Sequence, residues 1–199
     1  MASTATADLP TAAILSAAPS HVPKRTKLTV ADLLALKGKR QLVLCTAFDE
    51  WTARAAEEAG VDMIVAWGEN LEHSKMVIAA VRRGAPHTLI GSGINPEAYI
   101  SVEKAIETAI AIRGVGTDII YCSGLVPDKF AGLSSQHFPC CGHVGYLPCN
   151  DTWFGGPRAV GKTAVEAKKI FDDVMALEAA GVSVPARSFG RGVLAMAMN

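Results

Sequence analysis

The chain has 199 residues, of which 50% are hydrophobic and 19% are charged, and 19 basic residues balance 19 acidic ones. This length and composition predict one folded domain rather than a disordered chain. A net charge of zero gives no electrostatic basis for a nucleic acid or an anionic membrane as partner. No apolar run reaches the roughly 18 residues of a membrane-spanning helix. The five cysteines, an odd number, favour free thiols in a reducing compartment.

Residues 1–27 differ in composition from the rest of the chain. They are rich in Ala, Ser, Thr and Pro, and their only basic residues are Lys24, Arg25 and Lys27. We interpret them as a disordered leader, with a mitochondrial transit peptide as the alternative because the segment is Ser-rich and poor in acids. The corresponding locations are the cytoplasm or, for a transit peptide, the mitochondrion. The folded domain is expected at residues 28–199.

From residue 28 onward, short apolar runs alternate with amphipathic segments. The apolar runs predict strands at 41–48, 61–67, 87–90, 118–122, 138–144 and 183–186. The amphipathic segments predict helices at 51–59, 71–83, 101–113 and 163–180. Residues 125–136 lack the clean helical pattern expected between two of these strands.

Strands that alternate with helices predict right-handed βαβ units and a parallel sheet. The number of units favours an α/β fold of the (β/α) TIM-barrel type. A full barrel usually takes about 250 residues and at least roughly 200, whereas the last strand candidate here lies near 183–186. We therefore expect an incomplete or shortened barrel. A partner chain that closes the barrel is one interpretation, so a homo-oligomer is expected; a shortened relative is the other.

Polar and small residues follow the predicted strands at their carboxyl ends, where parallel α/β folds bind ligands. They are Asp49, Gly68, Glu69, Asn70, Ser92, Ser123 and His143. If the strands curl into a barrel, these residues converge on one site. Their carboxylates can hold a hard cation such as Mg²⁺, and His143 can move protons or hydrogen-bond a carbonyl. The alternatives are an N-cap role for Asp49 and a structural role for His143.

Three other motifs suggest competing chemistry. The first is a possible zinc cluster of His137, Cys140, Cys141, His143 and Cys149. Its spacing forms no Cys-x-x-Cys pair, and adjacent cysteines on a strand point to opposite faces. The second is a nucleophilic thiol at Cys122 or Cys140, with His143 as its one candidate base.

The third motif is a phosphate loop. Residues 156–163 fit the pattern G-x-x-x-x-G-K-[ST]. Such a loop must follow a buried strand, and the residues before it are polar. We therefore interpret the segment as a turn that leads into the last predicted helix.

Four segments together resemble the ketopantoate hydroxymethyltransferase family, within the wider phosphoenolpyruvate mutase and isocitrate lyase barrel group. They are KLTVADLLALKGKRQLVLCTAFDEWTARAAEEAGVDMIV, AVRRGAP, GHVGYLP and GKTAVEAKKIFDDVMALEAAGV. The resemblance covers roughly residues 28–181. It implies a barrel that transfers a hydroxymethyl group from methylenetetrahydrofolate to 3-methyl-2-oxobutanoate, a 2-oxo acid chelated by Mg²⁺.

The same resemblance assigns roles to residues and shows where this chain departs from the family. The family's metal-binding Gly-Asp-Ser reads Gly68-Glu69-Asn70, and its second metal aspartate falls at Ser92. Its Lys-Leu-Glu reads Tyr121-Cys122-Ser123, its histidine is kept as His143, and its glutamate base has no clear counterpart in VSVPARSFG.

The resemblance thus implies a catalytic His143 and Glu69 as the one remaining metal ligand. The residues expected to bind substrate are Asp49, Gly68, Asn70, Ser92, Tyr121 and Ser123. Mg²⁺ binding is expected to be weak or absent, and the family's transfer slow or absent. The alternatives are another reaction of the barrel group, such as carbon–carbon lysis or a tailoring step, and a non-catalytic relative.

Overall fold

The computed structural model describes residues 26–36, 38–93, 100–123, 126–147, 150–190 and 193–196. These residues form a seven-stranded sheet whose strands follow the chain order. The strands are β1 (Leu44–Thr46), β2 (Met63–Ala66), β3 (Leu89–Gly93), β4 (Ile119–Ser123), β5 (Cys140–Gly145), β6 (Val184–Gly190) and β7 (Val193–Met196). Strands β1 to β6 pair in parallel with their neighbours, which confirms the parallel arrangement predicted from the sequence. Strand β7 runs antiparallel to β6.

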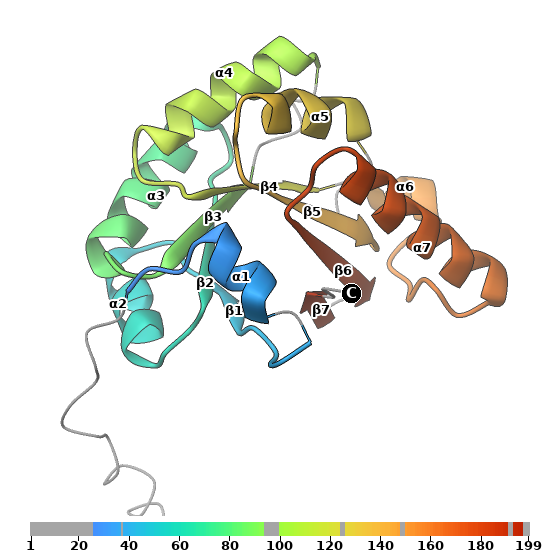
Figure 1. Ribbon diagram of the computed structural model, residues 1–199, viewed down its shortest axis with the longest axis horizontal. Helices are drawn as coiled ribbons and strands as arrows, with labels where there is room; N and C mark the ends of the chain where they lie inside the picture. The colour runs from blue at the N-terminus through green and yellow to red at the C-terminus, as the bar shows by residue number, and fades with distance from the viewer. Residues whose placement is uncertain are drawn as a thin grey trace, which may run out of the picture.

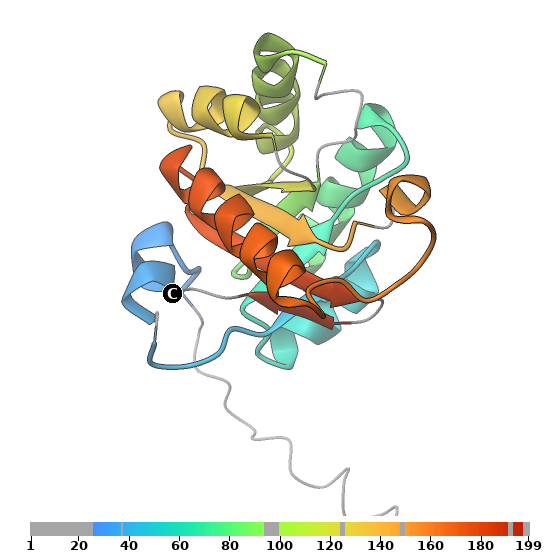
Figure 2. The same cartoon turned by 90° about the vertical axis from the view of Figure 1, so that its right-hand side faces the viewer.

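Helices surround the outer face of the curled sheet (Figure 1). The helices are α1 (Val30–Leu36), α2 (Glu50–Glu58), α3 (Leu71–Gly84), α4 (Val102–Arg113), α5 (Pro127–Ser135), α6 (Asp151–Phe154) and α7 (Ala164–Ala179). Helix α1 differs from the others because it lies at the end of the sheet where the strands begin (Figure 2). None of the helices in the described ranges is long and apolar enough to cross a membrane.

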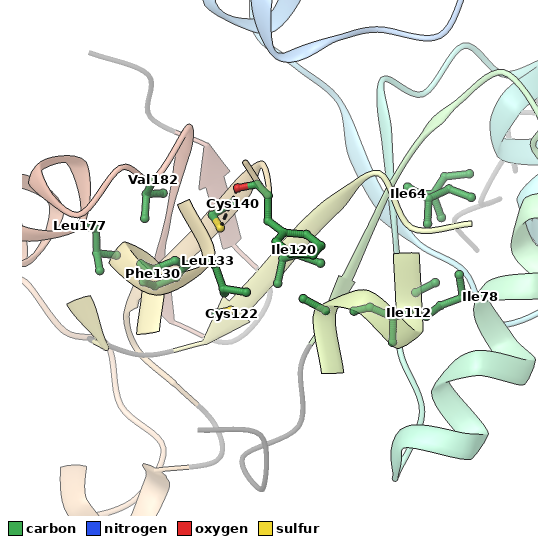
Figure 3. Close-up of a cluster of buried hydrophobic side chains, with 14 of the residues drawn as sticks. Ile64, Ile78, Ile112, Ile120, Cys122, Phe130, Leu133, Cys140, Leu177 and Val182 are labelled. Atoms are coloured by element: carbon green, nitrogen blue, oxygen red, sulfur yellow. Dashed lines mark hydrogen bonds between the residues drawn. The ribbon is translucent and has the colours of Figure 1, made fainter. Parts of the chain in front are cut away.

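The sheet separates two apolar clusters, because successive side chains of a strand point to opposite faces. The outer cluster lies between sheet and helices and includes Ile64, Ile120, Phe130 and Leu177 (Figure 3). The inner cluster lies on the concave face and consists of Leu33, Met63, Val65, Leu89, Ile119, Tyr121 and Cys141. Leu33 of α1 is 1% exposed, so α1 covers the inner face at the amino ends of the strands. The inner face is therefore covered at the amino ends of the strands, and the residues expected to form the site lie at the carboxyl ends.

The sheet curls as in a TIM barrel but stays open within the described residues. The hydrogen-bonded order runs from β1 to β7, and no pairing joins β7 back to β1 in that part of the chain. A closed barrel of this type has eight parallel strands. The prediction of an incomplete (β/α) barrel is therefore confirmed.

Four elements differ from the sequence predictions. Residues 127–135 form helix α5, although the pattern indicated no clean helix there. Its first residue is Pro127, and it buries Phe130 and Leu133 completely, so packing rather than periodicity stabilises it. Helices α1 and α6 and the antiparallel strand β7 were not predicted. The leader assigned to residues 1–27 lies almost wholly outside the described residues.

Arg82 of α3 ties the amino ends of β3 and β4 together. Its guanidinium donates to the carbonyl oxygens of Thr88 at 3.0 Å and Gly116 at 2.8 Å, and it forms an ion pair with Asp118. Asp118 also accepts from the backbone N–H of Ile90 at 2.9 Å and pairs with Lys27. One side-chain pair thus fixes a helix, two strands and the segment that precedes α1.

Replacing Arg82 by Leu is expected to lower the free energy of unfolding by about 3 kcal/mol, because it leaves the largely buried Asp118 without its main partner. Chemical denaturation measures this change. The matched control is Arg83→Leu, since Arg83 is 63% exposed where it pairs with Glu50 and such pairs contribute about 1 kcal/mol or less. Equal losses for the two variants would contradict the role given to Arg82.

Candidate functional site

A row of four inward-facing positions crosses the carboxyl ends of β2 to β5, and we call it the inner row. Its members are Trp67, Gly93, Tyr121 and His143. Ala66 pairs with Ser92, which places Trp67 beside Gly93, and Gly93 pairs with Tyr121. The ring of Tyr121 lies 5.8 Å from that of His143 between centroids, tilted by 46°. The sheet therefore brings together side chains that lie up to 76 positions apart in the sequence.

His143 is the polar centre of this row. Strand β5 turns Cys141 and His143 toward the inner face, and His143 is 9% exposed. Burial lowers the pKa of its imidazole from 6.5 to about 4, so the ring is neutral at neutral pH. Burial likewise raises the pKa of the Tyr121 hydroxyl. The pair can therefore donate and accept hydrogen bonds to a ligand but supplies no fixed charge.

The backbone of Ser123 lies beside the inner row, and Ser92 faces the other side of the sheet. Ser123 pairs in register with His143 across β4 and β5. Ser92 pairs with Ile120, and Ile120 belongs to the outer cluster. Ser92 is fully buried on that helix-facing side. The residue that faces inward at the end of β3 is Gly93, so the expectation that Ser92 faces the site needs this correction.

Asp49 and Asn70 cap helices instead of pointing jointly at a ligand. One carboxylate oxygen of Asp49 accepts from the N–H groups of Trp51 and Thr52, both at 2.9 Å. The bond from Thr52 lowers the pKa of this carboxyl. The side-chain oxygen of Asn70 accepts from the N–H of His73 at 2.9 Å and caps α3. The N-cap alternative for Asp49 is thus confirmed.

Gly68 and Glu69 lie at the turn from β2 into α3. The N–H of Gly68 donates to the Ser74 hydroxyl at 2.9 Å, and a Cβ at Gly68 would come within 2.5 Å of the Ser74 backbone nitrogen. Only glycine fits that approach. Glu69 is exposed, and its N–H donates to Nδ1 of His73 at 3.3 Å.

The donor set of this region does not fit a tightly held Mg²⁺. Mg²⁺ needs near-octahedral oxygen ligation, usually with one or two carboxylates. Of the two acids among the predicted site residues, Asp49 caps a helix and Glu69 alone is left, and Gly93 has no side chain to offer. Across the described part of the chain, no group of three His, Cys, Asp or Glu side chains could hold a metal ion.

Two aromatic residues of the site were missed by sequence reasoning. The rings of Phe48 and Trp67 meet edge to face, with centroids 5.4 Å apart and planes at 81°. Phe48 is 50% exposed and Trp67 is 45% exposed. Their positions at the ends of apolar runs suggested ordinary strand residues. The signal that could have found them is strand alternation: Ala47 and Ala66 face the helices, so the next residues, Phe48 and Trp67, face inward.

The competing cysteine chemistry finds no support in the geometry. Cys140 lies in the outer cluster and Cys141 in the inner one, so the two thiols point to opposite faces. Burial raises the pKa of the Cys140 thiol to about 12 and raises that of Cys141 as well. Buried thiols of this kind are poor nucleophiles. Cys149 lies outside the described residues.

The phosphate-loop alternative is also excluded. The loop before α7 follows α6 and not a strand. The Glu166 carboxylate accepts from the N–H of Lys162 at 3.1 Å and pairs with Arg158 at 2.8 Å. An acid therefore already occupies the amino end of α7. A pocket of about 350 Å³ does lie beside α6 and α7, lined by Trp153, Phe154, Arg158 and Ile170 among others, and no member of the inner row is among its lining residues.

Comparison with solved structures supports the barrel. The phosphoenolpyruvate phosphomutase of Streptomyces platensis superposes with a TM-score of 0.60 at 12% identity, covering 80% of this chain and 64% of that one. A phosphonopyruvate hydrolase solved with oxalate and Mg²⁺ gives 0.62 at 13% identity, covering 82% and 63%. At such identities the likeness shows the fold alone.

Comparison with known sequences identifies the family. A 3-methyl-2-oxobutanoate hydroxymethyltransferase of Kosmotoga olearia is 33% identical over 174 residues, and the match covers 78% of this chain and 64% of that protein. The Thermus thermophilus enzyme of the same name is 34% identical over 186 residues, covering 80% and 69%. The chain thus spans about two thirds of the length of these relatives. The family profile named Ketopantoate hydroxymethyltransferase matches residues 27–185, so the chain belongs to the ketopantoate hydroxymethyltransferase family.

Proposed function

We propose that this chain binds a small 2-oxo acid at the inner row and transfers a hydroxymethyl group slowly or not at all. Membership of the family supports the ligand class. The observation that carries the proposal is the inner row itself, in which Tyr121 and His143 stand together and none of the four members is an acid. The row thus keeps hydrogen-bonding groups for a carbonyl and lacks the charges that the family's reaction uses.

In this proposal His143 forms a hydrogen bond with the carbonyl or carboxylate oxygen of the ligand. A neutral imidazole carries one N–H donor and one acceptor nitrogen. Because the ring is buried against Tyr121, a hydrogen bond to it forms in a low dielectric and fixes the ligand's orientation. His143 therefore positions the oxo acid, and the proton that leaves the substrate carbon has no carboxylate acceptor among the inner-row residues.

Weak catalysis follows from the missing charges. Enolate formation places negative charge on the carbonyl oxygen, and preorganised cations or donors normally stabilise it. Where the family has a lysine, this chain has Tyr121, and the acids expected to hold Mg²⁺ are reduced to Glu69. Each lost electrostatic partner typically costs about 10²–10³ in rate. Methylenetetrahydrofolate would then be a poor co-substrate.

Calorimetric titration with 3-methyl-2-oxobutanoate should show binding that Mg²⁺ changes less than about twofold. His143→Gln should weaken this binding by up to about tenfold, because one hydrogen bond contributes about 0.5–1.5 kcal/mol. Glu69→Ala is the control and should leave the affinity unchanged. A titration that releases no heat of binding, or that does not reach saturation, would contradict the proposal that the chain binds a 2-oxo acid.

The rate is tested separately by an assay for ketopantoate with methylenetetrahydrofolate and excess Mg²⁺. We expect turnover at least about 10³ below the usual enzymatic range of roughly 1–10³ per second. Turnover inside that range would mean that the chain assembles a complete metal site and that the proposal of impaired transfer is mistaken.

The buried His143 also predicts a pH dependence of stability. Its folded pKa of about 4 lies below the ordinary 6.5, so between these values the unfolded chain binds the proton that the folded chain does not. The free energy of unfolding should therefore fall by about 3 kcal/mol from pH 6.5 to pH 4 through this residue. Denaturation of His143→Gln should lack that part of the slope, whereas His87→Gln, at an exposed position, should keep it. Parallel slopes for all three proteins would refute the assignment.

A further inference from the structure

The pocket of about 350 Å³ beside α6 and α7 lies on the helix-facing side of the sheet, at the carboxyl end of β5. Its walls come from β5, α6, α7 and the loop between the two helices, which adjoin one another in Figure 1. Ligand pockets typically measure about 300–1,000 Å³, so this one has room for a small molecule. Its lining residues Val144, Val160 and Ile170 belong to the outer cluster, whereas the inner row faces the opposite side of the sheet. The pocket is therefore a second candidate binding site.

The floor of this pocket is apolar and one wall is aromatic. Leu147, Val160 and Ile170 line it and are only 6%, 8% and 7% exposed. Trp153 of α6 lines the same pocket but is 88% exposed. A nearly uncovered indole beside a hollow offers apolar surface that a ligand can cover.

The aromatic wall is held in place by the residue that follows β5. Tyr146 is 1% exposed, and its hydroxyl donates a hydrogen bond to the Asp151 carboxylate at the start of α6. The ring of Tyr146 also lies 6.1 Å from that of Phe154, between centroids. Helix α6 is thus anchored at both ends, so a ligand does not have to order this wall when it binds.

Four charged side chains line the pocket, two of each sign. Arg158 pairs with Glu166 at 2.8 Å, and Lys169 pairs with Asp173 at 2.7 Å. Within the described part of the chain, the bonds of Arg158 use Nε and Nη1, which leaves the two N–H donors of Nη2 for a ligand. Each carboxylate has about four acceptor sites, more than these pairs use. The rim thus offers partners for an anion and for a cation and has no net charge.

Such a rim discriminates against ligands that carry a single charge. A carboxylate at Arg158 would also face the acids Glu166 and Asp173, and an amine beside these acids would also face two cations. Like charges placed close together weaken binding. A zwitterion matches both signs, because its carboxylate can bond to a guanidinium and its ammonium to a carboxylate. The apolar floor and Trp153 suit an aromatic side chain on the same ligand.

We propose that this pocket binds a zwitterionic α-amino acid with an aromatic side chain. The ligand's carboxylate accepts from Nη2 of Arg158, its ammonium donates to Asp173, and its ring covers the indole of Trp153. Asp173 is the favoured acid because Glu166 already accepts from the N–H of Lys162. The site lies across the sheet from the inner row, so the inference goes beyond the proposed function and does not rest on it.

Calorimetry on the full chain compares L-phenylalanine with two analogues that each lack one charge, 3-phenylpropionate and 2-phenylethylamine. L-phenylalanine should reach saturation and bind at least about tenfold more tightly than either analogue, because each analogue loses a charge-assisted hydrogen bond. Saturating 3-methyl-2-oxobutanoate should leave that affinity unchanged. Absence of saturation by L-phenylalanine, equal affinities for the three compounds, or displacement by the oxo acid would each overturn the inference.

Asp173→Asn removes the proposed partner of the ammonium group. It should weaken L-phenylalanine binding at least about tenfold and leave 3-phenylpropionate binding no weaker, a split that a general loss of packing would not produce. The matched control is Asp172→Asn, because Asp172 pairs with Lys168, is 54% exposed and does not line this pocket. The control should bind L-phenylalanine like the unaltered chain.

Trp153→Ala removes the aromatic wall at an exposed position. It should weaken L-phenylalanine binding about fivefold, whereas Trp51→Ala, at a 73% exposed tryptophan on α2, should not change it. Circular dichroism checks that all four variants fold. L-phenylalanine binding that survives both Asp173→Asn and Trp153→Ala unchanged would place the amino acid elsewhere and contradict the assignment to this pocket.

Discussion

The alternation of side chains along each parallel strand decides which residues of this protein can meet. In β3 to β5, one set of positions packs against the surrounding helices and the other faces inward. A shift of one residue moves a side chain to the opposite face. For this reason Ser92 and Gly93, neighbours in sequence, have different surroundings: the first is fully buried against the helices, and the second lies in the inner row beside Trp67.

Ion pairs lie at the amino ends of the strands, and the aromatic side chains of the inner row lie at the carboxyl ends. At the amino ends, Arg40 pairs with Asp62 and Arg82 with Asp118, and these pairs hold the strand starts together. At the carboxyl ends, Asp49 caps α2 and Glu69 is exposed. The inner row is consequently neutral, with His143 held uncharged by burial. An uncharged inner row suits ligand binding better than enolate chemistry.

Sequence patterns located the strands and long helices well, because apolar runs and amphipathic periods report burial directly. They failed where a buried segment lacks a regular spacing of apolar residues. Helix α5 contains Gly132 and ends in Ser134-Ser135, yet Phe130 and Leu133 are fully buried and hold it in place. For the site, the patterns found the strand ends and His143, but they could not fix the face of each residue, since that depends on a register known only from the paired strands. Phe48, Trp67 and Gly93 were missed for this reason.

The central claim is that His143 is the residue that meets a 2-oxo acid. The most direct measurement is the NMR spectrum of imidazole-labelled protein during titration with 3-methyl-2-oxobutanoate without Mg²⁺, with His143→Gln used to assign its signal. Among the five histidines, the resonances of His143 are predicted to shift with saturation while the other four stay in place. A saturating shift at another histidine with His143 unmoved, or no shift at any of them, would contradict the account.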